Sequence, residues 1–166
     1  ADTDNIFLAG DSAGGHFSCV TTAVNLNEDM QEDFGVEYCG FDFNAVAAIC
    51  PAVDLLSPNL LMNVNVPILL GDKWRKSNFK KYLDVNQIIS KNFPPFYVNT
   101  ARNDFLKKQC YKLKDILEKN NIEHKFHDFD KPLSHVFNVV DPFSKYGDQA
   151  NTEIAEFFKS RMKTKA

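Results

Sequence analysis

The sequence lacks a strong excess of either charge, and it lacks any long apolar run. Its 166 residues include 19 Lys and Arg against 22 Asp and Glu, which gives a net charge of -3. That balance disfavours a protein whose main function is to bind nucleic-acid phosphates. No apolar run approaches the roughly 18 residues that a membrane helix needs. We therefore expect no nucleic acid among its partners and no membrane span, and 44% hydrophobic residues indicate an ordinary globular domain.

Cysteine is scarce as well, and its spacing shows no pairing pattern. The four cysteines form no Cys-x-x-Cys pair and no zinc-site spacing, so we expect buried free thiols and no bound metal. Free thiols suit a reducing compartment, which favours a cytoplasmic location. The chain begins at Ala1 with a strand-like segment close behind, as a cut end would, so any targeting segment is expected upstream. The cysteines are Cys19, Cys39, Cys50 and Cys110.

Short segments along the chain have the composition of β-strands. Residues 5–9, 45–50 and 96–101 are continuous apolar runs, which predict strands covered on both faces. Residues 123–129 mix polar and apolar side chains, as an edge strand does. Continuous apolar strands are typical of sheets with both faces covered, so the sequence predicts a mostly parallel sheet.

Helical patterns follow the predicted strands. After residue 13, Phe17, Val20 and Val24 recur at i, i+3 and i+7. Amphipathic helices are also predicted within 104–121 and 148–162. Their apolar faces comprise Leu106, Cys110, Leu113 and Leu117 in the first and Ala150, Ile154, Phe157 and Phe158 in the second. The alternation predicts an α/β fold with flanking helices, one domain over residues 1–166, and a cap-like or lid-like connection at 54–92.

Residues 10–14 read Gly-Asp-Ser-Ala-Gly, the pattern Gly-x-Ser-x-Gly, between a predicted strand and a predicted helix. In that context the serine lies on a sharp turn. We expect both flanking positions, Gly10 and Gly14, to require glycine, because a side chain at either one would collide with the neighbouring strand or helix. Ser12 is then the candidate nucleophile. The N–H of Ala13, at the positive end of the helix, is a candidate oxyanion donor. The alternative is a phosphate-binding or tightly packed turn, but the segment lacks the Gly-x-Gly-x-x-Gly spacing and the P-loop lysine.

A serine nucleophile needs a base and a group that orients the base. His135 follows the last predicted strand at the carboxyl edge of the sheet, where open α/β sheets carry their sites, and it is the favoured base. Asp104 ends the preceding strand at the same edge and is the favoured acid, although a helix N-cap explains that position equally well. Asp54, which also follows a strand, is the alternative acid. The chain order Ser12, Asp104, His135 is the hydrolase order of serine, acid and histidine.

The other histidines are predicted to lie outside this site. His16 is one helical turn after Ser12 and points away from the tip of the turn. His124 and His127 are three residues apart in a predicted strand, so they face opposite sides of the sheet and cannot converge on one metal or one serine.

Three motifs carry a family resemblance: Gly10-Asp-Ser-Ala-Gly-Gly15, Asn92-Phe-Pro-Pro-Phe96 and Ser134-His-Val-Phe137. Together they resemble the hormone-sensitive-lipase-type carboxylesterases of the α/β-hydrolase fold, from residue 4 to the last helix. The resemblance implies a serine esterase or lipase that hydrolyses carboxylic esters, often short acyl ones, through an acyl-enzyme and without a cofactor. It implies Ser12 as nucleophile, His135 as base and then acid, Asp104 as its orienting partner and Ala13 N–H as an oxyanion donor.

The sequence departs from the family pattern in two places. Ala101 stands where the family commonly has glycine in the turn before the acid. The family also places four strands and a His-Gly-Gly-rich oxyanion loop ahead of the elbow strand, so this chain resembles the carboxyl-terminal half of such an enzyme. We expect residues 5–9 to form an unpaired edge that joins the missing half or a second copy of the chain. The isolated chain is expected to have little or no esterase activity.

Two other functions stay open from the sequence. A catalytically incomplete pseudo-hydrolase that acts as a binding scaffold would keep the same turn. Basic and aromatic residues interleave at 73–82, as at a single-stranded nucleic-acid site, but a solvated helix face explains them without a partner. Apolar residues of the 54–92 connection either line an acyl pocket or belong to the core: Leu55, Leu56, Leu60, Leu61, Met62, Ile68 and Leu69.

Overall fold

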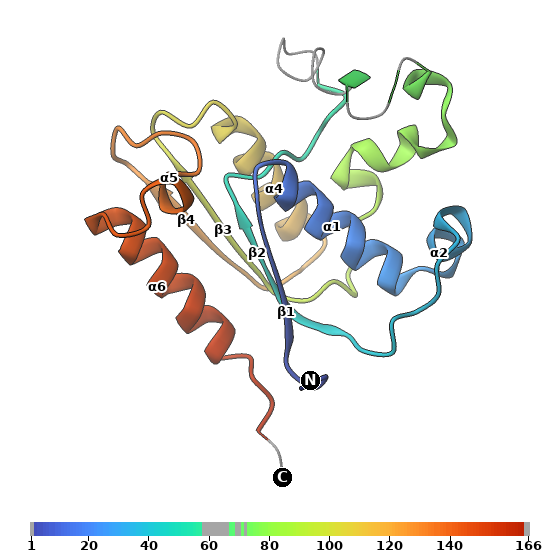
Figure 1. Ribbon diagram of the computed structural model, residues 1–166, viewed down its shortest axis with the longest axis horizontal. Helices are drawn as coiled ribbons and strands as arrows, with labels where there is room; N and C mark the ends of the chain where they lie inside the picture. The colour runs from blue at the N-terminus through green and yellow to red at the C-terminus, as the bar shows by residue number, and fades with distance from the viewer. Residues whose placement is uncertain (1, 58–66, 69–70, 72, 165–166) are drawn as a thin grey trace.

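A four-stranded parallel sheet forms the centre of the protein. In this computed structural model the described residues are 2–57, 67, 68, 71 and 73–164. The strand order is β1-β2-β3-β4, and each neighbouring pair is parallel (Figure 1). The strands are β1 (Ile6–Asp11), β2 (Phe43–Ile49), β3 (Phe96–Ala101) and β4 (His124–Phe129). The predicted α/β fold with a parallel sheet is confirmed.

Helices cover both faces of this sheet. Figure 1 shows α1 and α4 on one side and α6 on the other. The helices are α1 (Ala13–Leu26), α2 (Glu28–Phe34), α4 (Lys107–Lys119), α5 (Phe137–Val140) and α6 (Lys145–Lys159). Between β2 and β3 lie the 3-10 helices η1 (Trp74–Lys76), η2 (Asn78–Leu83) and η3 (Val85–Gln87). Among the described residues, no helix is long and apolar enough to cross a membrane.

Alternate residues of β2 enter two different cores. Val46 and Ala48 pack with α1 and α4, whereas Ala45 and Ala47 pack with α6. Because both faces are covered, β3 is buried along its whole length and β2 from Ala45 onward. The continuous apolar runs of β2 and β3 are therefore explained by burial of both faces of the sheet, as the sequence predicted.

The two outer strands differ from the inner ones. β4 lies at one edge, as its mixed composition predicts. β1 forms the other edge of the described sheet, and its apolar side chains are only partly buried. Within the described residues β1 has a strand neighbour on one side only, in line with the expected unpaired edge, but its side chains are less buried than its apolar run predicted.

The buried face of α1 differs from the predicted one. Phe17 is 57% exposed, and Val20 and Val24 are partly buried. The buried residues of α1 are instead mostly small or polar: Gly15, His16, Ser18, Cys19, Thr22, Ala23 and Asn25. A helix that approaches a sheet this closely needs small residues at the contact, so the apolar period marked the wrong side.

The predicted apolar face of α4 is confirmed, since all of its predicted members are buried. The last helix spans 145–159, three residues earlier at each end than predicted, because Ser144 caps it by accepting the N–H of Gly147. Helix α2 was not predicted. It has clear end signals, with the Asn27 side chain accepting the Met30 N–H and Gly35 in the left-handed conformation at its end.

The cysteines are free thiols, as expected, but not all are buried. Cys19, Cys50 and Cys110 are buried, whereas Cys39 is exposed. The Cys39 thiol lies 2.8 Å from the Oδ1 atom of Asn25. The prediction of burial is therefore wrong for Cys39, which belongs to the surface loop between α2 and β2.

Candidate active site

β1 delivers Ser12 to the start of α1 through a strained turn. Ser12 has φ 53° and ψ -115°, a positive-φ conformation that costs free energy in a residue other than glycine. The Ser12 N–H donates to the carbonyl of Ile49 at 2.9 Å, and the Ala52 N–H donates to the Ser12 carbonyl at 2.9 Å. The end of β2 and the loop behind it therefore hold the Ser12 backbone in this conformation.

Two glycines near the turn lie too close to other atoms for a side chain, and the sequence predicted one of them. A Cβ on Gly10 would overlap the backbone of Gly14, as expected. At Gly14 the expected collision is absent, because the nearest atom to a Cβ would be Asp11 Oδ1 at 3.9 Å. The second close approach is at Gly15, where a Cβ would lie 2.6 Å from the Cβ of Pro51. Packing of α1 on the loop after β2 thus requires Gly15 rather than Gly14.

The carboxyl ends of β3 and β4 lead into the segments that bring Asp104 and His135 together. His135 Nδ1 lies 2.7 Å from Asp104 Oδ1, and the Asp104 side chain is fully buried. The carboxylate also accepts the Thr100 hydroxyl at 2.7 Å and the Leu106 N–H at 2.9 Å. Burial alone would raise the pKa of Asp104, but these three hydrogen bonds outweigh it and hold the pKa below its usual value. Asp104 is thus an ionised carboxylate in direct contact with His135 Nδ1.

The other ring nitrogen of His135 is available. Nε2 is buried and has no hydrogen-bond partner in the described part of the chain. The Ser12 hydroxyl is therefore not bonded to it here, so the structure joins the candidate acid and base and leaves the contact between nucleophile and base open. Such contacts are often long without substrate. The Phe105 ring lies against the imidazole, with 4.2 Å between ring centroids, and restricts its rotation.

Asp54, the alternative acid, has a different partner. Its Oδ2 atom accepts Lys112 Nζ at 2.8 Å, and its Oδ1 atom accepts the N–H of Leu56 at 2.9 Å. The carboxylate that contacts His135 is Asp104. Asp54 and Asp104 thus both follow a strand, but Asp54 pairs with a lysine and Asp104 with a histidine.

The remaining histidines occupy the structural positions predicted for them. His16 is 3% exposed, and burial lowers its pKa to about 4, so its imidazole is neutral at neutral pH. His124 lies 4.0 Å from Glu118 of α4, whereas His127 lies 2.9 Å from Glu153 of α6. Since α4 and α6 cover opposite faces of the sheet, these two side chains diverge as expected.

One group of described side chains could offer ligand atoms to a metal ion. Cys50, Asp104 and His135 place one such atom each within 4.8 Å of one another. Burial raises the pKa of the Cys50 thiol far above its usual range, so the thiol keeps its proton. A metal bound by this group would have to displace that proton. The geometry therefore favours acid–base chemistry at this position.

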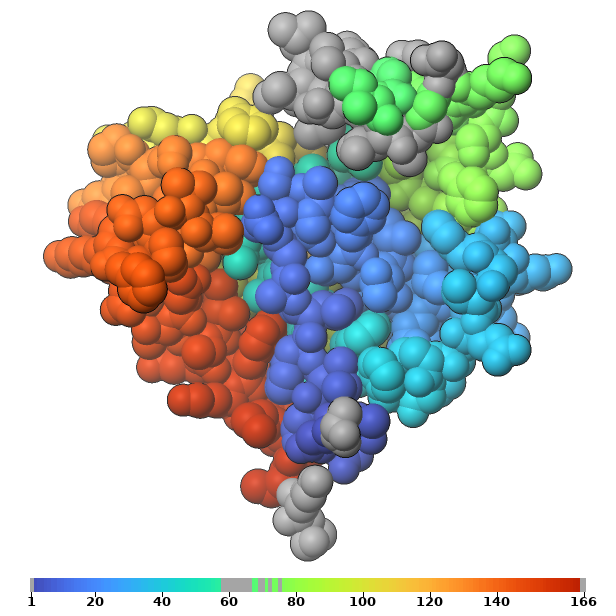
Figure 2. Space-filling view, in the orientation of Figure 1, coloured from blue at the N-terminus to red at the C-terminus, as the bar shows by residue number. Residues whose placement is uncertain are grey.

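An apolar cavity of about 280 Å³ lies beside α1. In Figure 2 the first part of α1 (blue) lies between the segment after β4 (orange) and the 3-10 segment (green). The cavity is lined mainly by aromatic and aliphatic side chains: His16, Phe17, Val20, Phe34, Trp74, Ser77, Phe79, Lys80, Tyr82 and Leu83. The 54–92 connection thus contributes to an apolar cavity through η1 and η2.

Of the apolar residues left open between a pocket and the core, none of the described ones lines the cavity. Leu55 packs against a buried cluster that includes Trp74, and Leu56 and Ile68 are exposed. Leu60, Leu61, Met62 and Leu69 lie outside the described residues. The sequence reasoning considered the aromatic residues at 73–82 only as a nucleic-acid site and did not expect them in an apolar cavity, because their spacing in η1 and η2 follows neither the strand nor the α-helix period.

The basic and aromatic residues at 73–82 do not form an exposed stacking surface. Trp74 and Tyr82 are buried. Lys81 pairs with Asp33 at 2.6 Å. Of Trp74, Phe79 and Tyr82, only Phe79 is exposed (43%), so these side chains form no series of exposed rings on which bases could stack.

A parallel sheet that carries a strained serine and a buried carboxylate–histidine pair beyond its carboxyl edge is the architecture of hydrolases with a nucleophile elbow. A family model described as alpha/beta hydrolase fold matches residues 1–138. The match covers well over half of the 166 residues, so the chain belongs to this family. The predicted resemblance is confirmed at this level. A comparison with curated proteins found no match.

Solved structures of bacterial esterases have the same fold. Esterase B from Lactobacillus rhamnosis (HN001) is 25% identical with a TM-score of 0.85, over 97% of this chain and 54% of that one. A carboxylesterase, Cest-2923 from Lactobacillus plantarum WCFS1, is 15% identical with a TM-score of 0.72, over 99% of this chain and 62% of that one, and this likeness concerns the fold alone. The chain thus spans about half the length of esterase B.

Proposed function

We propose that the protein is a serine carboxylic-ester hydrolase that acts through an acyl-enzyme. Ser12 is the nucleophile, His135 the general base and then the general acid, and Asp104 the group that orients His135. The observation that carries the proposal is the buried Asp104–His135 pair at 2.7 Å, with His135 Nε2 unbonded. A buried, ionised carboxylate on Nδ1 keeps the proton there, so Nε2 presents a lone pair that accepts a proton.

In the proposed reaction, Ser12 Oγ attacks the ester carbonyl carbon and its proton passes to His135 Nε2. The oxyanion that develops is stabilised by the N–H of Ala13 at the positive end of α1. The carbon–oxygen bond to the alcohol then breaks, and Nε2 returns the proton to the leaving oxygen. Water then attacks the acyl carbon while Nε2 takes a water proton. The bond from that carbon to Ser12 Oγ breaks, Nε2 returns the proton to Oγ, and the carboxylic acid leaves.

We propose short acyl esters as substrates. The cavity of about 280 Å³ beside α1 offers an apolar wall for part of such an ester. A solved structure of esterase B is described as inhibited by a C4-C4 SN3 tributyrin phosphonate, and that enzyme is 25% identical over 97% of this chain. The inhibitor of esterase B supports a short acyl group, and the cavity supports only its apolar character, since Ser12, Asp104 and His135 are not among the residues that line it.

We propose that the active protein also needs strands beyond those of this chain. The chain covers about half of esterase B, and the apolar side chains of β1 are only partly buried at the sheet edge. A further strand on β1 would cover them, supplied by the complementary part of the fold or by a second copy. Other oxyanion donors would come with it, and losing one such donor typically costs about 10²–10³ in rate.

A fluorophosphonate probe tests the proposal, because it reacts with an activated serine. We expect labelling of the complete protein at Ser12, none in Ser12→Ala, and strongly slowed labelling in His135→Ala. Turnover of p-nitrophenyl esters of increasing acyl length would then report the acyl preference. A folded protein that leaves Ser12 unlabelled would instead be a pseudo-hydrolase scaffold.

A further inference from the structure

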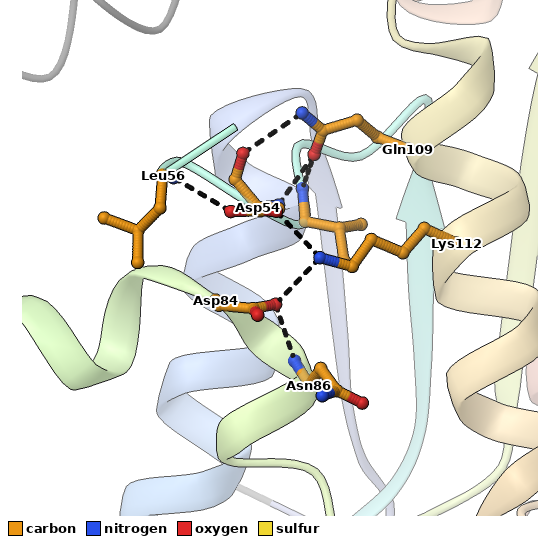
Figure 3. Close-up of polar contacts among 7 residues, drawn as sticks. Asp54, Leu56, Asp84, Asn86, Gln109 and Lys112 are labelled. Atoms are coloured by element: carbon orange, nitrogen blue, oxygen red, sulfur yellow. Dashed lines mark hydrogen bonds and ion pairs between the residues drawn. The ribbon is translucent and has the colours of Figure 1, made fainter. Parts of the chain in front are cut away.

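A polar network on α4 holds the loop that supports Ser12. Gln109 Oε1 accepts the N–H groups of Val53 at 2.6 Å and Asp54 at 2.7 Å, and Gln109 Nε2 donates to the Asp54 carbonyl at 3.2 Å (Figure 3). Gln109 is buried, so water does not replace these bonds. One side chain therefore satisfies three backbone groups of the loop after β2.

This loop is in direct contact with the nucleophile turn. Ala52, immediately before Val53, donates its N–H to the Ser12 carbonyl at 2.9 Å. Pro51 is the residue on which Gly15 rests at the start of α1. A shift of the loop would therefore move the backbone of Ser12, which the loop holds in a strained conformation.

The same helix also holds the candidate acid. The N–H of Leu106, just before α4, donates to Asp104, and Cys110 Sγ lies 3.6 Å from Asp104 Oδ2. Gln109 is the neighbour of Cys110 in the chain. One turn around the start of α4 thus contacts both the acid and the loop beneath the nucleophile, and it connects the two parts of the site.

An ion pair reinforces this arrangement. Lys112 Nζ donates to Asp54 at 2.8 Å and to Asp84 at 3.2 Å (Figure 3). Although partial burial works in the opposite direction, the hydrogen bonds to both carboxylates raise the pKa of Lys112. The chain around Asp54 is also bridged to the chain around Asp84 in antiparallel fashion. The loop is thus held from two sides, by the backbone around Asp84 and by Gln109 and Lys112 of α4.

We propose that Gln109 is a positioning residue for the esterase reaction and sets the location of Ser12 relative to His135 through the loop at residues 51–54. The inference rests on the proposed function. Gln109 touches no reacting atom, so its loss affects the geometry of attack rather than substrate binding. A displacement of a catalytic group that leaves substrate binding intact reduces kcat and leaves KM nearly unchanged.

The test compares Gln109→Met, which keeps the volume but removes every hydrogen bond, with Gln109→Glu, which keeps an acceptor for the two N–H groups. Active-site titration with a fluorophosphonate counts folded sites in the complete protein. For p-nitrophenyl acetate we expect kcat per titrated site to fall about tenfold in Gln109→Met with KM within twofold, and less than threefold in Gln109→Glu. Lys114→Met, which removes the exposed ion pair with Glu118 on the same helix, is the matched control and should match the wild type.

The outcomes separate the inference from the function beneath it. Equal kcat per titrated site in the wild type and Gln109→Met would overturn the positioning role and leave the esterase proposal standing, since any loss of activity would then reflect fewer folded molecules. Gln109→Glu as slow as Gln109→Met would also overturn it, because the acceptor would not be the relevant feature. A wild type that is folded but unlabelled at Ser12 would refute both proposals.

Discussion

Two carboxylates follow neighbouring strands of the sheet and have different surroundings. Asp104, after β3, has a fully buried side chain and accepts hydrogen bonds from His135, Thr100 and the backbone of Leu106. Asp54, after β2, keeps a side chain that is 20% exposed and pairs with Lys112. The location at the end of a strand is the same for both. Their partners distinguish them, since Asp104 contacts an imidazole and Asp54 pairs with a lysine of α4.

The largest expected difference between these carboxylates is in catalysis. Asp104→Asn should lower kcat by about 10⁴-fold, because an amide on Nδ1 no longer favours the tautomer that leaves Nε2 free to accept a proton. The variant should keep its fold, since asparagine has nearly the same shape. Steady-state turnover and circular dichroism of the complete protein measure both. An Asp104→Asn variant that keeps a tenth of wild-type activity would remove Asp104 from the proposed triad.

A second comparison concerns His16, the histidine near Asp54. His16 is buried close to Asp54 and Asp84, and burial still lowers its pKa from 6.5 to about 4. Between pH 6.5 and pH 4, His16 is protonated in the unfolded chain but neutral in the folded protein. The free energy of unfolding should therefore fall as the pH drops through this range. At about 1.4 kcal/mol per pKa unit, the loss approaches about 3 kcal/mol.

Chemical denaturation of the wild type and His16→Leu across that pH range checks this expectation. The difference in unfolding free energy between them should change by about 3 kcal/mol from pH 7 to pH 4. A difference that stays constant over this range would mean that His16 is protonated in the folded protein.

A smaller effect is expected within the Asp104 environment. Thr100→Val removes the buried hydroxyl that donates to Asp104 at 2.7 Å. The pKa of Asp104 should rise, and its hold on His135 should weaken, with a fall of about tenfold in kcat, in line with the 1.5–3 kcal/mol of a hydrogen bond to a charged group. Thr100→Ser restores the hydroxyl and should recover most of the activity. Equal losses in the two variants would assign the effect to packing instead.

The smallest effect is expected at Asp54. Asparagine keeps the oxygen that accepts the Leu56 N–H, and Lys112 keeps its bond to Asp84. Because the ion pair is partly exposed, Asp54→Asn should cost no more than about 1 kcal/mol of unfolding free energy. Its kcat should stay within threefold of the wild type. If Asp54→Asn lost more activity than Asp104→Asn, the acid role would belong to Asp54.

Features set by short-range sterics were predictable from the sequence. The strands at 45–50 and 96–101 depend on continuous apolar composition, and the turn at Ser12 depends on a local glycine pattern. The amphipathic face of α4 was likewise visible as a period of apolar residues. α1 was the exception: its period marked Phe17, which is exposed, because the close contact with the sheet selects small residues that no hydrophobic period reveals.

The sequence by itself determined the α/β class, the elbow motif and a short set of candidate acids and bases, because each follows from residues that are close in the chain. It left Asp54 and Asp104 as alternatives and expected a steric role for Gly14 that Gly15 has instead. Only the tertiary structure shows that the two carboxylates have different partners and that Gly15, rather than Gly14, makes the close contact. Asp104 meets His135 across 31 residues and Asp54 meets Lys112 across 58. Contacts at such separations arise when the sheet assembles and packs against its helices, which the local pattern does not encode.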